Sequence, residues 1–196
     1  LPAGGRLIDR ASQLPFRFGG RHLRGLVGDT LASALLANGQ MLMGRSFKYH
    51  RPRGPNSSGV EEPNALLGLG QGGRFEPNQR ATTTPLVAGM VTSAQNCWPS
   101  LTADVGAVNN WLYRFFPAGF YYKTFMYPRG FWKHVFEPII RRSAGLGKAP
   151  TDADLDTYEQ AYAHVDEVVV GGGIAGLTAA LDAAQSGKSV WVLEQN

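Results

Sequence analysis

A glycine-rich segment near the end of the chain has the residue types and spacing of a phosphate-binding turn. Gly171-Gly172-Gly173-Ile174-Ala175-Gly176 directly follows Val165–Val170, whose β-branched residues predict a buried strand. Leu177–Ser186 then has the composition of a helix, and Ser189–Leu193 predicts a second strand that ends at Glu194. A strand, a glycine turn, a helix and a second strand in this order are typical of the first βαβ unit of a dinucleotide-binding domain.

Each glycine of this fingerprint has a mechanical role. Gly171 permits the tight strand-to-helix turn, Gly173 lets a pyrophosphate approach the backbone, and Gly176 allows helix and strand to pack closely. The helix start faces the phosphates with free N–H groups, and Glu194 lies where an acid accepts hydrogen bonds from a ribose. An acid here favours NAD or FAD over NADP, and the fingerprint alone does not separate NAD from FAD. The alternative is a glycine-rich turn without a ligand, which the flanking elements disfavour.

The start of the chain predicts a hairpin followed by a helix. Leu14–Phe18 and Arg21–Val27 are typical of strands, and Gly19-Gly20 between them is a hairpin turn signal. Asp29 is positioned to cap a helix that Gly39 ends with a left-handed residue. A hairpin with a helix across it is how a β-grasp domain begins.

The middle of the chain has weaker patterns. Residues 45–85 predict long loops with a few short strands, and residues 111–136 are so rich in aromatic side chains that we expect a core or a subunit interface. Thr157–His164 predicts a short helical lead-in. The fold class is therefore α+β followed by α/β. The expected domains are a β-grasp domain over 1–100, an aromatic-rich connecting segment and linker over 101–156, and the start of a Rossmann-type FAD/NAD-binding domain over 157–196. A single βαβ unit leaves sheet faces uncovered, so we expect this domain to continue beyond residue 196.

Composition excludes several classes of function. Cys97 is the one cysteine, so disulfide frameworks and cysteine-built metal centres are excluded within the chain. The four histidines show no ligand spacing, and no metal site is expected. No apolar run is long enough for a bilayer and no signal-peptide pattern is present, which predicts a cytoplasmic protein without membrane contact. The net charge of +4 is modest, and the basic cluster at 45–53 predicts loop packing rather than nucleic-acid binding.

Several longer motifs carry a resemblance to a known family. They are Gly28–Gly39, Gly44–Gly54 (Gly-Arg-Ser-Phe-Lys-Tyr-His-Arg-Pro-Arg-Gly), Glu61–Ala65, Asn96–Ser100 and Pro117–Met126. Together with the fingerprint, these segments resemble the alpha subunits of heterotetrameric sarcosine oxidases, whose ferredoxin-like domain precedes the nucleotide domain. The match extends to the end of the chain.

Iron–sulfur relatives of this family carry cysteine ligands spaced C-x4-C-x2-C, with a fourth further on. The resemblance places these positions at Ser57, Glu62, Ala65 and Thr82, and none of them is a thiolate. Because such clusters need sulfur ligands, we expect a clusterless ferredoxin-like domain of 2Fe-2S type.

The resemblance also implies a function. It implies oxidative demethylation of sarcosine with oxygen and water to glycine, formaldehyde (or 5,10-methylenetetrahydrofolate) and hydrogen peroxide, in a complex with beta, gamma and delta subunits. The implied cofactors are NAD in this subunit, FAD and FMN in the full complex, and tetrahydrofolate as co-substrate. Gly171, Gly173, Ile174 and Gly176 are implied to hold NAD through their backbone, and Glu194 and Gln195 to meet the adenosine ribose.

No residue of the chain is predicted to be catalytic, because flavin supplies the chemistry of amine oxidation. The chain is expected to supply scaffold and part of the NAD site, and to be inactive alone. Two alternatives stay open. One is an electron-transfer module in which a ferredoxin-like domain feeds a flavoprotein. The other is the corresponding subunit of a related opine or secondary-amine dehydrogenase, or of a cyanide synthase.

Overall fold

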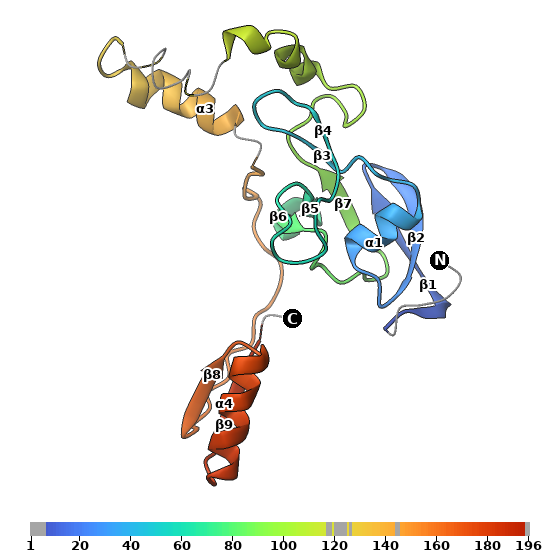
Figure 1. The fold of residues 1–196 in the computed structure, drawn as a ribbon, viewed down its shortest axis with the longest axis vertical. Coiled ribbons are helices and arrows are strands. Elements are labelled where there is room, and N and C mark those ends of the chain that lie inside the picture. The colour runs from blue at the N-terminus through green and yellow to red at the C-terminus, as the bar shows by residue number, and fades with distance from the viewer. Residues whose placement is uncertain (1–6, 117–118, 120–124, 126, 144–145, 195–196) are drawn as a thin grey trace. The chain divides into compact units, whose positions relative to one another are not determined.

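The computed structural model describes residues 7–116, 119, 125, 127–143 and 146–194. The chain divides into two compact units, Leu1–Leu155 and Asp156–Asn196. We call them the N-terminal unit and the C-terminal unit. Figure 1 shows the elements of both.

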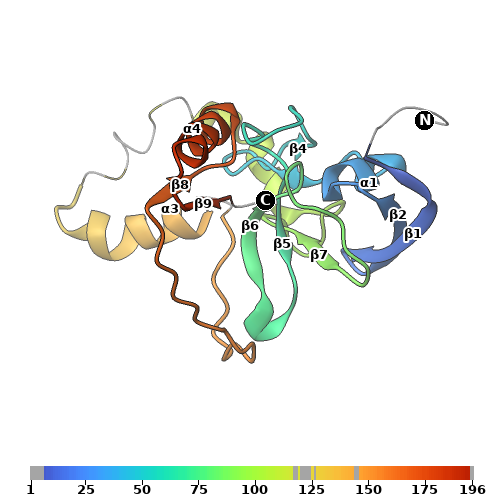
Figure 2. The same cartoon turned by 90° about the horizontal axis from the view of Figure 1, so that it is seen from below.

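A mixed five-stranded sheet is the centre of the N-terminal unit, with strand order β2-β1-β7-β5-β6. Its strands are β1 (Asp9–Phe18), β2 (Arg21–Val27), β5 (Leu66–Leu69), β6 (Glu76–Arg80) and β7 (Val91–Ala94). β1 pairs antiparallel with β2 and parallel with β7, while β5 is antiparallel to both β6 and β7. Figure 2 shows β5, β6 and β7 side by side.

The predicted hairpin is confirmed. β2 has the predicted bounds, β1 begins five residues earlier than predicted (residue 9 rather than 14), and Phe18 pairs with Arg21 across the turn. Gly19 and Gly20 have φ of +53° and +83°, which is the backbone conformation that a tight two-residue hairpin turn requires. Burial alternates along the last residues of β1, and the side chains of Phe16 and Phe18 lie in the core.

Helix α1 (Leu31–Ala37) follows β2, but its cap is not the predicted one. Thr30, rather than Asp29, is the N-cap: its hydroxyl accepts the N–H of Ser33 at 3.2 Å, and the Ser33 hydroxyl accepts the N–H of Thr30 at 3.0 Å. Asp29 closes the preceding turn instead, because its carboxylate accepts the N–H of Leu26 at 2.9 Å. The expected left-handed Gly39 is confirmed with φ of +71°.

The hydrophobic core lies between α1 and the sheet. Leu31, Leu35, Leu67 and Met43 are completely buried, and Phe16 is nearly so. The buried positions of α1 thus form one face of the helix, while the neighbouring Leu36 is exposed. Burial of this face holds a helix of only seven residues in place, since such a short helix is marginal alone.

The rest of the N-terminal unit consists of short elements joined by loops. They are β3 (Gly44–Arg45), β4 (Pro52–Arg53), and the short helices η1 (Gly72–Arg74), η2 (Val105–Asn110), η3 (Tyr113–Phe115), η4 (Trp132–Phe136) and α3 (Glu137–Ser143). Within the described part of the aromatic segment, Trp111, Phe115 and Tyr127 are exposed, so these three side chains do not form a core. Its alternative role in a subunit interface stays a prediction.

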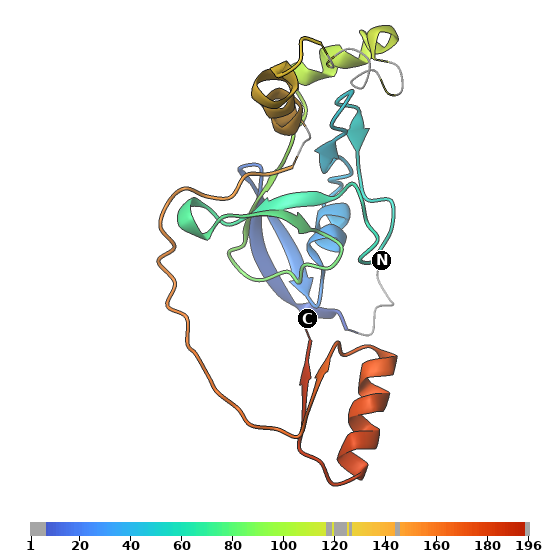
Figure 3. The same ribbon diagram turned by 90° about the vertical axis from the view of Figure 1, so that its left-hand side faces the viewer.

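The C-terminal unit contains the predicted βαβ arrangement. Strands β8 (Glu167–Val170) and β9 (Val190–Leu193) are parallel, and α4 (Ile174–Gln185) connects them and lies along the pair, as Figure 3 shows. The helical lead-in predicted at 157–164 is wrong: this segment has no regular structure. Its side chains are exposed, so burial adds little to the stability of a short helix there. Among the described residues, no helix has the length and apolarity needed to cross a bilayer.

Candidate functional site

The glycine turn lies where β8 ends and α4 begins. Val170 pairs with Leu193, so both parallel strands end at the same edge, and the N–H of Gly171 donates to the carbonyl of Leu193 at 2.8 Å. Gly173 is the N-cap of α4 and Ile174 is its first residue. The structure therefore brings four predicted site residues to the carboxyl edge of this strand pair, which is where open α/β sheets bind ligands.

Two glycines of the turn have different surroundings. A side chain at Gly176 would place its Cβ 1.9 Å from the carbonyl oxygen of Gly171, so this position must lack one for the turn to close. A Cβ at Gly173 would meet no atom within 4 Å, and no side chain caps the helix there. Gly176 thus serves the packing of the turn itself, whereas Gly173 leaves open space at a helix N-terminus that favours anions.

Glu194 lies beside the same turn. Its carboxylate oxygen Oε2 accepts the N–H of Gly172, which joins the end of β9 to the glycine segment. The predicted contact of Glu194 with a ribose stays a prediction. Gln195, the other residue expected at the adenosine, lies outside the described residues.

The four positions that the family resemblance assigns to cluster ligands come together in the N-terminal unit. The carboxylate of Glu62 accepts the N–H of Ser57 at 2.6 Å and the N–H of Ala65 at 3.1 Å. The hydroxyl of Thr82 donates to the carbonyl of Gly59 in the same loop at 2.8 Å. Glu62, Ala65 and Thr82 are buried. These positions therefore lie close together around the Glu62 carboxylate.

Burial of Glu62 alone would raise its pKa. The backbone N–H bonds from Ser57, Asn64, Asn56 and Ala65 outweigh that effect and hold the pKa of Glu62 below its ordinary value. The carboxylate is therefore ionised in the folded chain at neutral pH.

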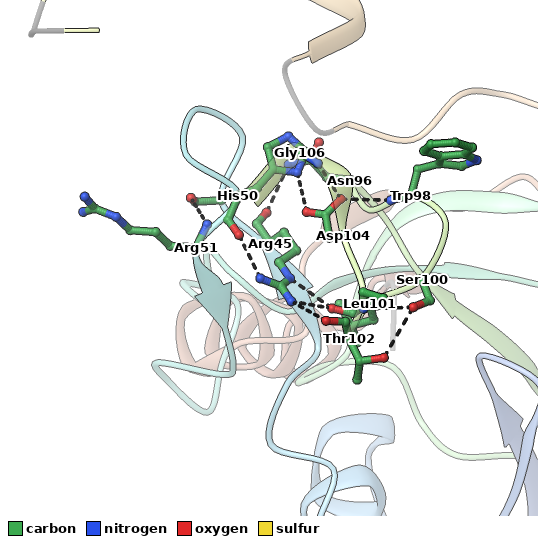
Figure 4. A network of polar contacts seen from close by, with 12 residues as sticks. Arg45, His50, Arg51, Asn96, Trp98, Ser100, Leu101, Thr102, Asp104 and Gly106 are labelled. Carbon is green, nitrogen blue, oxygen red and sulfur yellow. Dashed lines mark hydrogen bonds and ion pairs between the residues drawn. The ribbon is translucent and has the colours of Figure 1, made fainter. Parts of the chain in front are cut away.

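A second polar network joins the loop after β3 to the loop before η2, as Figure 4 shows. Nδ1 of His50 lies 2.6 Å from Oδ2 of Asp104, and the Asp104 side chain is only 1% exposed. The other oxygen of Asp104 accepts the N–H groups of Trp98 at 3.0 Å and Gly106 at 3.3 Å. Burial alone would raise the pKa of Asp104. The hydrogen bonds and His50 lower it by more than burial raises it, so the pKa lies below the ordinary value.

Arg45 reinforces the same junction. Its guanidinium donates to the carbonyl of Leu101 at 2.7 and 3.0 Å and to the carbonyl of His50 at 3.0 Å. Nearby, burial and then the Asp104 carboxylate raise the pKa of the Cys97 thiol, so this cysteine is less reactive than an exposed one. Arg45, His50 and Asp104 therefore fix two loops to each other.

Asp104→Asn is expected to lower the free energy of unfolding by about 1–3 kcal/mol near neutral pH, because it removes a buried charged acceptor. The pKa of Asp104 is lower in the folded chain than in the unfolded chain, where it lies near 3.8. The Asp104 carboxylate therefore adds to the free energy of unfolding above that unfolded pKa, and this stabilisation is lost as the pH falls through the folded pKa. Urea unfolding near pH 7 and near pH 3 should show that the variant differs less from the wild type in acid. Asp152→Asn is the matched control, because Asp152 is exposed. If Asp104→Asn lost the same free energy of unfolding at both pH values, the stabilising role of the ionised Asp104 would be contradicted.

Comparison with known families matches the chain to a ferredoxin-like domain followed by the start of an FAD-binding domain. Residues 11–97 match the 2Fe-2S iron-sulfur cluster binding domain family, and residues 166–196 match the FAD binding domain family.

Over its whole length the chain is similar to one subunit of an oxidoreductase. It is 56% identical over 195 residues to sarcosine oxidase subunit alpha of Rhizobium meliloti (strain 1021), covering 100% of this chain and 20% of that relative. It is 32% identical over 191 residues to sarcosine oxidase subunit alpha of Corynebacterium sp. (strain P-1), covering 96% of this chain and 15% of that relative. The predicted resemblance to sarcosine oxidase alpha subunits is therefore confirmed.

A solved structure, L-proline dehydrogenase from P. horikoshii, has a TM-score of 0.42 and 19% sequence identity to the chain. That likeness covers 94% of this chain and 25% of the dehydrogenase chain.

The cofactor prediction is wrong. NAD was expected in this subunit, FAD and FMN in the full complex and tetrahydrofolate as co-substrate, and an iron–sulfur cluster was expected to be absent. The matches are instead to an FAD-binding family at the turn and to a family of 2Fe-2S cluster-binding domains over residues 11–97. NAD was implied by the family resemblance, and the fingerprint could not correct it because it is common to NAD and FAD sites.

The two groups fit the described residues differently. At the turn, an uncapped helix N-terminus and the open space at Gly173 fit the pyrophosphate of a dinucleotide such as FAD. Around Glu62, the four side chains Ser57, Glu62, Ala65 and Thr82 include no thiolate and do not fit a 2Fe-2S cluster. Within the described part of the chain, no three His, Cys, Asp or Glu side chains gather as a metal site.

Sequence reasoning missed the roles of three side chains. It placed Glu62 at a former ligand position without foreseeing that its carboxylate would collect backbone N–H groups, and it did not pair His50 with Asp104. Backbone N–H groups that point into the fold from a loop rich in Gly, Asn and Ser need acceptors, and that need was the available signal for Glu62. The pairing of His50 with Asp104 spans 54 residues and has no local signature.

Proposed function

We propose that this chain forms part of the alpha subunit of a multisubunit, flavin-dependent sarcosine oxidase. The reaction is the oxidation of sarcosine by oxygen and water to glycine, formaldehyde and hydrogen peroxide. The observation that carries the proposal is the 56% identity to a sarcosine oxidase alpha subunit over all of this chain. Because the chain spans about a fifth of that relative, the activity belongs to the longer protein in complex with its partner subunits, which we propose to be beta, gamma and delta.

The contribution of this chain is to bind and position a dinucleotide. FAD, when bound, would supply the two-electron oxidation of an amine. Gly171, Gly173 and Ile174 would hold its pyrophosphate through backbone groups at the start of α4, and Gly176 would keep the turn closed. Glu194 and Gln195 would accept hydrogen bonds from the adenosine ribose. None of these residues donates or accepts a proton of the substrate, so the proposal places no catalytic residue in this chain.

The test is a substrate panel with the purified full-length complex. Sarcosine, N,N-dimethylglycine and an opine are supplied in turn, and oxygen consumption, peroxide and formaldehyde are measured together. We expect the highest kcat/KM with sarcosine and equal amounts of formaldehyde and peroxide. Indifference to sarcosine would remove the substrate assignment. Turnover with an artificial electron acceptor but without peroxide would instead show a dehydrogenase of a related secondary amine.

A further inference from the structure

Glu62 lies at the centre of a ring of backbone N–H groups that the proposed oxidation does not use. Oε2 accepts the N–H of Asn56 and of Ser57, each at 2.6 Å. Oε1 accepts the N–H of Asn64 at 2.6 Å and of Ala65 at 3.1 Å. Each carboxylate oxygen therefore has two backbone donors, which is full coordination of a planar anion by one loop.

We propose that residues 56–65 form a carboxylate-binding site, which the chain fills with its own Glu62 side chain. The site is distinct from the glycine turn, and the inference does not depend on the proposed function.

Burial makes the site selective for an anion. Glu62 has no exposed surface, and the four N–H groups that converge on it would be left unpaired by an apolar side chain. The described residues provide no ion pair to this carboxylate; Arg80 donates to the backbone carbonyl of Glu62 at 3.0 Å instead. The negative charge is thus balanced by backbone dipoles, as in anion-binding nests.

The donors belong to the backbone, so they remain when the side chain is removed. Glu62→Ala would leave four N–H groups around a space that had held one methylene group and a carboxylate. A free carboxylate of similar size, such as formate or acetate, has the two oxygens that this arrangement requires. The exposed neighbour Glu61 offers a matched control, because it carries the same charge one residue away.

The experiment compares thermal unfolding of the wild-type chain with Glu62→Ala, Glu62→Gln and Glu61→Ala. We expect the melting temperature of Glu62→Ala to fall by about 5–15 °C, from the loss of hydrogen bonds to a buried charge. Acetate or formate should restore at least half of that loss, whereas chloride at equal ionic strength should not. Glu62→Gln should be destabilised but not restored, because its amide still occupies the space, and Glu61→Ala should match the wild type.

Three outcomes would overturn the proposal: a Glu62→Ala variant as stable as Glu61→Ala, recovery that is equal in chloride and acetate, or equal recovery of the Gln and Ala variants. If Glu62→Ala does not fold, hydrogen exchange of Glu62→Gln decides. The amides of Asn56, Ser57, Asn64 and Ala65 should then exchange at least about tenfold faster than in the wild type, with the amides of β1 unchanged. Unaltered exchange at those four amides would equally overturn it.

Discussion

Gly173→Ala is expected to lower the FAD content of the assembled full-length protein by about tenfold or more without unfolding the C-terminal unit. The backbone at Gly173 has φ of −69° and ψ of 177°, an extended conformation that alanine adopts without strain. Its Cβ would meet no protein atom within 4 Å, so the protein itself tolerates the change. The added methyl would instead occupy the space that the pyrophosphate needs, and about 1.4 kcal/mol of lost binding is a factor of ten.

The matched variant is Gly176→Ala, in the same turn. Its Cβ would lie 1.9 Å from the carbonyl oxygen of Gly171, so the turn itself must distort. We expect this variant to lose both bound flavin and helical content of the unit, measured by flavin absorbance and circular dichroism. A Gly173→Ala protein with wild-type flavin content would show that the turn has only a structural role.

Leu35→Ala is expected to destabilise the N-terminal unit by about 2–5 kcal/mol, the usual range for a leucine removed from a closed core. Leu35 has no exposed surface and belongs to the core between α1 and the sheet. Shortening its side chain therefore leaves a cavity in addition to the lost burial of apolar surface. Chemical denaturation followed by circular dichroism measures the effect.

Leu36→Ala is the control, because the same helix presents this neighbouring leucine at 39% exposure. The helix propensity changes equally in both variants, so their difference isolates packing. We expect Leu36→Ala to remain within about 1 kcal/mol of the wild type. Equal losses in the two variants would mean that α1 does not pack on the sheet through the face containing Leu35.

Local patterns predicted the elements whose signals are short-range. The Gly19-Gly20 turn and the strand, turn and helix around Gly171 each depend on residues that are close in sequence. Both were predicted in the right order, although α4 begins at Ile174, three residues before its predicted start. The cap of α1 was misplaced by one residue because Asp29 and Thr30 are both good capping residues, and only the turn after β2 decides between them.

Long-range partners were the part that sequence could not supply. The expected lead-in helix at 157–164 had a plausible composition, but the side chains of this segment are exposed. The position of Glu62 followed from the family resemblance, yet its four backbone donors depend on how the whole loop closes. The choice of FAD over NAD came from family matching, since the glycine pattern serves both nucleotides.

The parallel pairing of β1 with β7 has a consequence for synthesis on the ribosome. The hairpin of β1 and β2 closes locally, but the partner on the other edge of β1 is made much later, since the hydroxyl of Thr92 bonds the carbonyl of Arg17 across 75 residues. At about 5–20 residues per second, that edge waits roughly 4–15 s for its neighbour. During this interval the nascent hairpin exposes unpaired strand groups and the uncovered Phe16, so it is the stage at which the chain is most open to chaperones and to mispairing.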